Sequence, residues 1–238
     1  MSLYDALGER REGLYQKADG VMVAVVTNNK DPEGLGRVRL KLPLRETETE
    51  TGWTRVATLM AGNDRGTYFV PEVGDEVLVA FHLGELRNPF VIGTLWNSVH
   101  KAPKANEENH IRKIRSKSGH ELLFSDDPKS AKVNIVSAKG YTIEIDDTSD
   151  TVAVSTPNSS SSVKLKGGSS EEITLTSMGT QITITGNGEV KISAPKSIAL
   201  NAPEIKIEAA GSLSLKGGIA SVQSDGLTTI KGSLVKIN

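Results

Sequence analysis

The fold of this chain is decided by residues 173–192, which read ITLTSMGTQITITGNGEVKI. This stretch repeats one pattern: a polar residue separates two aliphatic residues, and a polar or Gly-containing corner follows. Strict alternation of this kind is typical of a β-strand with one buried face. The stretch therefore predicts short strands, and its three copies are Ile173-Thr174-Leu175, Ile182-Thr183-Ile184 and Val190-Lys191-Ile192.

The same pattern extends in both directions, over residues 121–238. The step between copies shortens along the chain, from ten residues between Ile135 and Ile145 to eight between Ile184 and Ile192. The aliphatic residues of the clearer copies are predicted to face inward and form a shared core: Ile143, Ile145, Val163, Leu165, Ile173, Leu175, Ile182, Ile184, Val190, Ile192, Ile198, Leu200, Ile205, Ile207, Leu213 and Leu215.

The short step indicates that one chain cannot enclose this core. A single-chain β-solenoid needs a coil of roughly 20 residues to surround its own interior. A step of eight to ten residues supplies one side of a triangular prism, so three chains must supply all three sides. We therefore expect a homotrimer with threefold symmetry, folded as an intertwined, triple-stranded β-helix. The shortening step predicts a taper towards the C-terminus.

Residues 21–97 have a different character. Alternating or β-branched runs between turn signals predict five strands, which suits a small closed barrel of the oligonucleotide/oligosaccharide-binding (OB) type. Residues 1–20 are expected to form a short helix or a frayed extension, and residues 98–120 a polar connector. The five predicted strands are residues 21–27, 36–42, 54–59, 76–81 and 89–95.

Composition narrows the classes of function. The 238 residues carry a net charge of −1, which gives no field to attract nucleic acid, so no such partner is expected. Cysteine is absent, which excludes disulfides and Cys-ligated metals. The sequence has neither a long apolar run nor an apolar segment near Met1. We therefore expect no membrane-spanning helix and no signal peptide.

No catalytic, cofactor or metal site is predicted, and the chain is expected not to be an enzyme. The four histidines, at positions 82, 100, 110 and 120, lack metal-ligand spacing. The carboxylate pairs Asp126-Asp127 and Asp146-Asp147 could suggest glycoside hydrolysis. They stand at corners, however, where Asp is favoured by turn geometry.

The aromatic residues of the barrel raise the question of single-strand binding, which needs exposed rings beside a basic groove. Because they stand mostly at apolar strand positions, core packing is the favoured interpretation for Trp53, Tyr68, Phe69, Phe81, Phe90 and Trp96. Lysines in the repeat are expected to lie on the outward face and keep the shaft soluble: Lys164, Lys166, Lys191, Lys206, Lys216 and Lys236.

Six stretches of the chain together resemble the VgrG and baseplate assembly protein V family. The segment that contains Pro-Glu-Val-Gly-Asp-Glu-Val is the most specific of them. The stretches are residues 36–43 (GRVRLKLP), 53–57 (WTRVA), 69–81 (FVPEVGDEVLVAF), 88–97 (NPFVIGTLWN), 114–122 (IRSKSGHEL) and 202–209 (APEIKIEA).

This resemblance implies the central spike of a contractile phage tail or type VI-like injection system. Such a trimeric needle pierces the target envelope, makes transient contact with its membrane and carries a tip protein. The family's larger hub domain is not found before the barrel, so a separate hub or tail-tube protein is expected at the N-terminal end. The chain ends in GSLVKIN without a His-x-His metal motif, so a separate PAAR-repeat tip protein is expected there. Assembly in the bacterial cytoplasm, followed by incorporation into a virion tail or injected particle, is the expected localisation.

A trimeric β-helical tail fibre that binds a receptor or glycan is the alternative. Fibres usually end in a non-repetitive head, whereas here the repeats run to the last residue. The parent machine, the target cell and any effector cargo are not specified by these residues.

Overall fold

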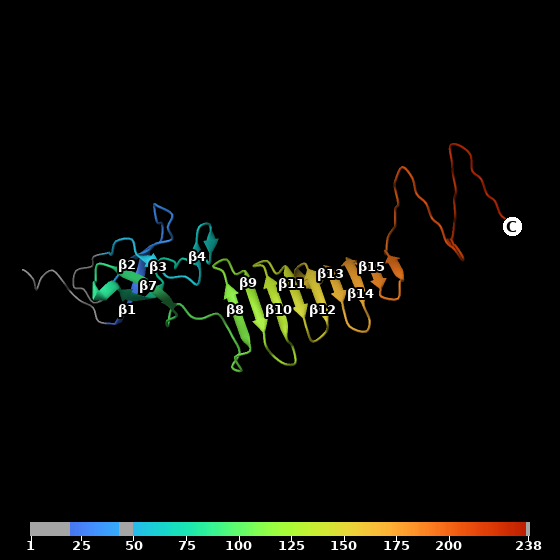
Figure 1. Ribbon diagram of the computed structural model, residues 1–238. Coiled ribbons are helices and arrows are strands. Elements are labelled where there is room, and N and C mark those ends of the chain that lie inside the picture. The colour runs from blue at the N-terminus through green and yellow to red at the C-terminus, as the bar shows by residue number, and fades with distance from the viewer. Residues whose placement is uncertain (1–19, 43–49, 237–238) are drawn as a thin grey trace, which may run out of the picture. The chain divides into compact units, whose positions relative to one another are not determined.

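The computed structural model (Figure 1) describes residues 20–42 and 50–236. Of the predicted helix or extension at residues 1–20, all but Gly20 lies outside the described residues. The described chain consists of strands and two short 3-10 helices, in agreement with an all-β prediction. None of its helices is long and apolar enough to span a bilayer. The chain divides into two compact units, one up to Val152 and one from Ala153 onward.

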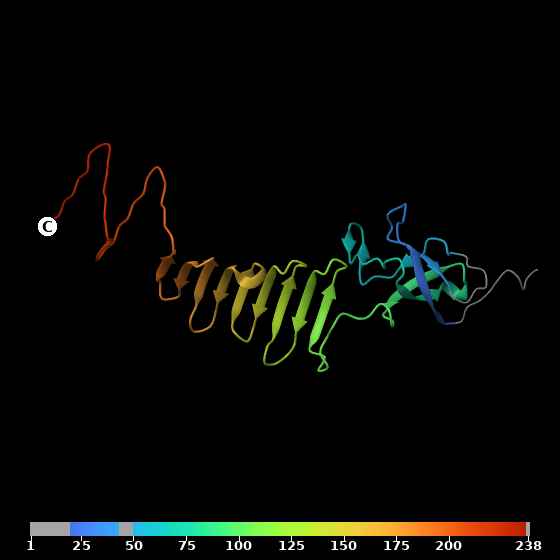
Figure 2. The ribbon, with the colours of Figure 1, turned by 180° about the vertical axis from the view of Figure 1, so that it is seen from behind.

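The first unit begins with a curled five-stranded sheet, seen from behind in Figure 2. The strand order is β2-β1-β6-β7-β3, with β3 and β7 parallel and all other neighbours antiparallel. Irregularities in the β1–β2 and β6–β7 pairings interrupt the register, and bulges of this kind bend a sheet. The strands are β1 (Val21–Asn28), β2 (Arg39–Lys41), β3 (Arg55–Val56), β6 (Glu76–Phe81) and β7 (Pro89–Leu95).

This curled sheet encloses its own core. In β6, Val77, Val79 and Phe81 are buried while the residues between them are not. Burial of every second side chain is the result expected of a strand with one face on a core. The buried apolar residues are Ala24, Val26, Val38, Leu40, Leu42, Val77, Val79, Phe81 and Val91.

Two strands are shorter than predicted. β2 occupies the centre of the predicted range 36–42, and β3 covers two residues of 54–59. Gly36 adopts a φ of 68°, a left-handed conformation that a regular strand does not contain. Val38 and Thr54 nevertheless form an isolated antiparallel bridge, so the two segments still lie side by side.

A hairpin stands where the sequence predicted only a turn. β4 (Ala61–Gly62) and β5 (Arg65–Gly66) pair antiparallel around Asn63-Asp64. Asp64 has a φ of 52°, a left-handed conformation that Asp tolerates in turns.

Four further strands of the first unit pair antiparallel in chain order, as an amphipathic meander. Gly119 and Gly140 occupy two of the connecting turns with φ of 92° and 87°, which Gly adopts without steric cost. The strands are β8 (Ile111–Arg115), β9 (Glu121–Ser125), β10 (Lys132–Val136) and β11 (Thr142–Asp146). The next strand, β12 (Thr151–Ser155), contains the boundary between the two units.

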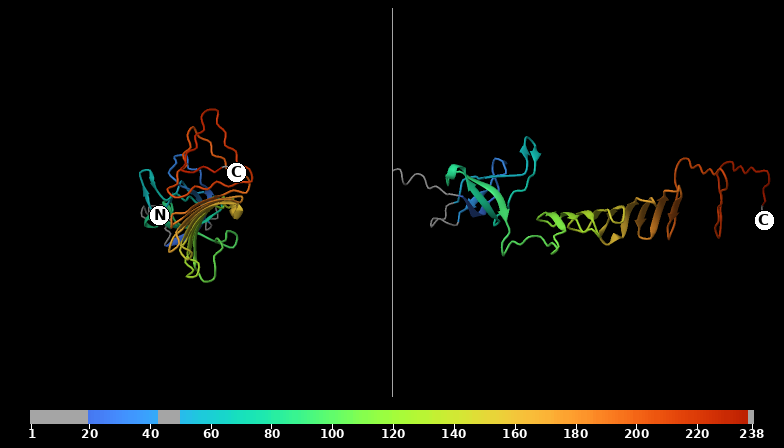
Figure 3. Two further views of the ribbon diagram at one scale, coloured as in Figure 1. Left: turned by 90° about the vertical axis from the view of Figure 1, so that its right-hand side faces the viewer. Right: turned by 60° about the horizontal axis from the view of Figure 1, so that its bottom comes forward.

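The second unit continues with a 3-10 turn, η2 (Pro157–Ser159), and four antiparallel strands in chain order. Figure 3 shows these strands as a curved layer. From Ala194 to Lys236 the described chain contains no strand and no helix. The four strands are β13 (Ser161–Lys166), β14 (Glu172–Ser177), β15 (Thr180–Thr185) and β16 (Val190–Ser193).

Candidate functional site: an exposed aliphatic sheet face

The strand register brings the predicted inward residues of the first unit onto one face. In the register of β8 to β11, Ile143 lies opposite Ile135, which lies opposite Leu122, which lies opposite Ile114. A second row joins Ile145, Val133, Phe124 and Arg112 in the same way. Cross-strand neighbours on one face have Cβ atoms about 4.5–5.5 Å apart, so each row forms a continuous apolar ladder. The first ladder ends at Ile114, and in the second Arg112 follows Phe124.

The second unit carries two such ladders across β13 to β16. One runs through Val163, Leu175, Ile182 and Ile192. The other joins Leu165, Ile173, Ile184 and Val190. Ten of the sixteen predicted core residues thus stand in these ladders, counting Ile143 and Ile145 of the first unit.

Most of these apolar residues are exposed in the single chain, and Leu122, Val133 and Ile182 are half-buried. Ile143 retains 43% of its accessible surface, Ile173 39%, Leu165 46% and Val190 60%. A run of this length far exceeds the isolated exposed aliphatic residues of an ordinary monomer surface. The face is therefore an uncovered interaction surface, which we call the aliphatic face.

The opposite face of the first unit's strands is more polar, although Ile111, Leu123 and Val136 also lie on it. Lys132 Nζ lies 2.9 Å from a carboxylate oxygen of Asp146 and 3.6 Å from one of Glu144. The Lys132 hydrogen bond lowers the pKa of Asp146 to about 2, and contact with Asp146 raises the pKa of Lys132. In the second unit Lys164 lies opposite Thr174, and Lys191 opposite Thr183, on the face away from that unit's own ladders. The strands are thus amphipathic, with the ion pairs of Lys132 on the face opposite the aliphatic rows.

The remaining six predicted core residues lie after Ser193, and the structure does not bring them together in a sheet. Their exposed fractions run from 50% for Ile205 to 82% for Leu215. The six residues are Ile198, Leu200, Ile205, Ile207, Leu213 and Leu215.

The carboxylate pairs serve turns, as the sequence analysis favoured. Asp146 Oδ1 accepts hydrogen bonds from the backbone N–H groups of Thr148 and Ser149. Asp127 Oδ1 accepts one from the backbone N–H of Lys129. These are local turn contacts, in which the carboxylate replaces a backbone acceptor.

No cluster of three or more His, Asp or Glu side chains that could hold a metal ion occurs in the described parts of the chain. His100 Nδ1 lies 3.4 Å from an Asp75 carboxylate oxygen, and His120 Nδ1 accepts a hydrogen bond from the backbone N–H of Ala138.

The prediction that the barrel aromatics pack in the core is wrong for three of them. Tyr68 is 79% exposed, Phe69 71% and Trp96 71%, whereas Phe81 belongs to the core. Tyr68 and Phe69 follow the β4–β5 hairpin, and Leu59 and Met60 precede it with 96% and 53% exposure. The hairpin diverts the chain away from the alternation that would have turned these side chains inward. The exposure of these side chains was missed because apolar residues at strand ends indicate burial by default.

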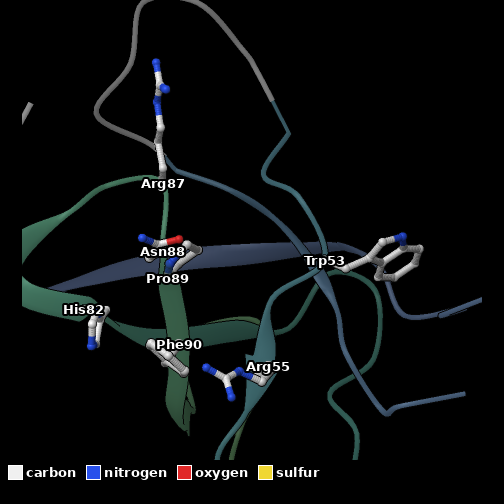
Figure 4. A pocket seen from close by; sticks show the side chains of 7 residues that line it. All are labelled: Trp53, Arg55, His82, Arg87, Asn88, Pro89 and Phe90. Carbon is white, nitrogen blue, oxygen red and sulfur yellow. The ribbon is translucent and has the colours of Figure 1, made fainter. Parts of the chain in front are cut away.

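A pocket of about 370 Å³ lies on the barrel beside β3 and the start of β7. Arg55 packs over the Phe90 ring at 4.5 Å. Figure 4 shows His82 and Arg55 on either side of that ring, whereas Arg87 and Trp53 point away from it. The polar side chains that line the pocket do not converge on one point. The lining residues are Trp53, Arg55, His82, Arg87, Asn88, Pro89 and Phe90.

A barrel loop is organised by one buried carboxylate. The Asp31 side chain is 3% exposed and accepts hydrogen bonds from the Arg37 guanidinium at 2.8 and 2.7 Å. It also accepts bonds from the backbone N–H groups of Glu33, Leu35 and Arg37. The Arg37 hydrogen bond holds the pKa of Asp31 well below its ordinary value and raises that of Arg37. Five donors on one carboxylate fix the loop that leads into β2.

The barrel and the amphipathic strands together define an all-β protein with an OB-type domain and an uncovered sheet face. Residues 22–96 match the family described as the type VI secretion system/phage-baseplate injector OB domain. The resemblance to the VgrG and baseplate assembly protein V family is thereby confirmed, and the chain is VgrG-like.

Curated relatives extend this match to about half of the chain. The type VI secretion system spike protein VgrG3 of Vibrio cholerae is 27% identical over 139 residues, which are 52% of this chain and 14% of that protein. The spike protein VgrG4b of Pseudomonas aeruginosa is 35% identical over 103 residues, covering 40% of this chain and 13% of the relative. A third relative is named actin cross-linking toxin VgrG1 of Vibrio cholerae, and it is 24% identical over 52% of this chain and 13% of its own length. The matches thus span about a seventh of these relatives.

Proposed function

We propose that three copies of this chain pack their aliphatic faces together and form the needle of a baseplate spike, which is driven through a target envelope. The observation that carries the proposal is the pair of exposed ladders across β13 to β16 of the second unit, with two similar rows across β8 to β11 of the first unit. A surface of this kind is stable in water only when it is covered. A second and third copy present an identical surface, which closed symmetry allows to meet at one axis.

The repeat length favours three copies over two. Two flat faces stacked on each other would leave strand edges open along both sides, whereas three faces can close a prism. The sixteen predicted core residues would then line the axis, and the face with Lys132, Lys164 and Lys191 would remain in solvent. This arrangement is an intertwined trimeric β-helix over residues 121–238.

The resulting needle is suited to transmitting an axial push. Each strand is hydrogen-bonded to its neighbours, and short turns join the strands, so the needle is expected to be stiff. Relatives over half of the chain are named type VI secretion system spike proteins. The proposed role is that of a structural, non-enzymatic component.

The connector at residues 98–120 is proposed to hold the barrel in register with the needle. Lys117 Nζ lies 2.9 Å from a Glu72 carboxylate oxygen, and His100 lies beside Asp75. Both contacts tie the connector to the loop between residues 71 and 76, within the first unit. The Lys117 hydrogen bond lowers the pKa of Glu72.

Two partners complete the proposed assembly. A hub or tail-tube protein would join the barrel end, and a PAAR-repeat tip protein would cap the C-terminal end, with transient membrane contact on firing. The assembly would form in the bacterial cytoplasm and leave it as part of a tail or an injected particle.

Light scattering coupled to size exclusion tests the proposal directly. The expected mass is three times 25.4 kDa. A stable, well-folded monomer would overturn the proposal. Co-purification with a PAAR-repeat protein separates a spike from a fibre, because a fibre would instead retain a glycan or receptor and leave the tip protein unbound.

A further inference from the structure

The outer side of the barrel sheet also carries rows of apolar side chains. β1 and β6 place Val21 opposite Ala80, and Val23 opposite Leu78. β7 extends the first row, because Phe90 lies opposite Ala80. Neighbours in register point to the same side of a sheet, and the residues that alternate with these in β6 belong to the core. The two rows therefore stand on the side away from the core, which we call the outer face.

The outer face is only partly covered by the described chain. Val21 keeps 56% of its accessible surface and Val23 39%, while the other members of the two rows are half-buried. At one edge Arg55 packs over the Phe90 ring. Antiparallel sheets with one solvated face normally turn polar side chains towards water. Apolar rows on that side therefore indicate a surface on which another segment packs.

One carboxylate stands at the end of the outer face. Glu76 is on the outward side of β6, between Val25 of β1 and Leu95 of β7. The residue is half-buried, and no other residue of the described chain forms an ion pair or hydrogen bond with its carboxylate. Removing a charge from water without a partner is unfavourable. The segment that covers the face is therefore expected to supply a cation.

The chain enters the outer face directly from residues 1–19, which lie outside the described structure. Val21 is both the first residue of β1 and a member of the first outer row. Gly20, immediately before it, lies in a bend and has a φ of 88°. A left-handed Gly commonly follows the end of a helix and redirects the chain. The bend allows the preceding segment to turn back over the face that begins at Val21.

The sequence before Gly20 has an apolar stripe at helical spacing. At about 100° per residue, Leu3, Leu7 and Leu14 fall within about 40° of one another on a helical wheel. Arg10 and Arg11 flank this stripe on its two sides. The acidic residues of the segment stand on the opposite side: Asp5, Glu9 and Glu12. A helix this short is marginal in water by itself, so it needs a surface on which to pack.

We propose that residues 3–15 form a helix that packs its leucine stripe on the outer face of β1, β6 and β7 of the same chain. A helix of about 13 residues is roughly 20 Å long, similar to the 6 residues of β6 at about 3.3 Å each. The arginines beside the stripe supply the cation for Glu76. The barrel sheet is then covered on both sides by its own chain. This placement concerns the barrel alone and does not depend on the proposed trimer.

Photocross-linking of the purified full chain tests this placement. The photoreactive residue p-benzoylphenylalanine replaces Leu7 in one variant and Leu14 in a second. After illumination, mass spectrometry of the digested protein should find cross-links to residues 21–28, 76–81 or 89–95, and the product should run as a single chain on a denaturing gel. The same replacement at Glu9, on the far side of the predicted helix, is the matched control and should give none of these cross-links.

A charge exchange tests the contact with Glu76. Glu76→Arg should reduce the cross-linking from position 7 several-fold, because three cations would then meet at the edge of the outer face. Adding Arg10→Glu and Arg11→Glu to that variant should restore the cross-linking. Arg10→Glu and Arg11→Glu without the change at position 76 are the control and should reduce it, since carboxylates would then face Glu76.

Each other outcome overturns the placement. Covalent dimers on the denaturing gel would show that the segment packs on a second copy. Absence of cross-links to the three strands from both positions 7 and 14 would show that the outer face is not where the segment packs. Equal cross-linking from position 9 would exclude a helix with one buried side, and failure of the charge exchange would exclude the contact with Glu76. None of these results bears on the trimer, which light scattering tests separately.

Discussion

Side chains point alternately to the two faces of the sheet both in the barrel strands and in the repeat strands. The face that carries the aliphatic core residues is buried in the barrel, however, and exposed in the repeat. In β6, Val77 and Val79 are fully buried, while Ile173 and Ile184 in β14 and β15 remain 39% and 40% exposed. The barrel strands come together in the order β2-β1-β6-β7-β3, which curls the sheet over its own apolar face. The repeat strands follow one another in chain order, and no described part of the chain folds back across them. Alternation therefore predicts which face is apolar, and topology decides whether one chain can cover it.

The largest expected effect is on assembly through the aliphatic face. Ile184→Asp would place three carboxylates together on the proposed dry axis, and burying unpaired charge is strongly unfavourable. The mass from light scattering should fall from three times 25.4 kDa to 25.4 kDa. Thr183→Asp is the matched control, since Thr183 lies on the polar face opposite Lys191, and it should remain trimeric. A heat-resistant trimer of Ile184→Asp would contradict the proposal that the aliphatic face is buried at the trimer axis.

A smaller effect is expected in the barrel, where the core belongs to one chain. Leu40 has 0% exposure, and Leu40→Ala should lower the free energy of unfolding of the barrel by about 2–5 kcal/mol. Urea denaturation followed by tryptophan fluorescence measures this change, and the mass should stay that of a trimer. Leu35→Ala, at a side chain with 66% exposure, should change stability by less than about 0.5 kcal/mol. Dissociation of the trimer by Leu40→Ala would show that the two regions are not independent.

The buried Asp31 carboxylate of the barrel loop should make the stability of the folded state depend on pH. The pKa of Asp31 is lower in the folded state than in the unfolded chain, so its contribution to stability is present above an ordinary Asp pKa of about 4. That contribution is lost as the pH falls from there towards the lowered pKa. Thermal unfolding between pH 7 and pH 2 should show a smaller acid loss for Asp31→Asn, which starts from a lower melting temperature at pH 7. Equal melting temperatures at pH 7 for the two proteins would contradict this assignment.

The smallest effect is expected at ion pairs on the solvent side of the repeat. Lys206 and Glu204 are 3.0 Å apart with side chains 73% and 72% exposed, and such pairs contribute little. Glu204→Gln should change the free energy of unfolding by less than about 0.5 kcal/mol in the same urea titration. A loss of several kcal/mol would mean that this face is covered in the assembly.

Much of the architecture was predictable because short-range patterns express it. The strands at 76–81 and 89–95 are found as predicted, since each is an uninterrupted run between strong turn signals. The Asp-rich corners were assigned correctly because a carboxylate beside a backbone N–H is a local contact. Tyr68, Phe69 and Trp96 were assigned wrongly, because their exposure depends on how the hairpin and the end of β7 leave the barrel.

The sequence by itself determined the period of the repeat, the face on which its aliphatic residues stand, and the resemblance in the barrel, since all three are read from spacing and residue type. Only the tertiary structure decided that one apolar face is enclosed by its own chain while the other stays open, and that pairing within the chain ends at Ser193. The physical reason is that covering a face requires a surface distant in sequence or in another molecule, and no local pattern encodes where that surface comes from.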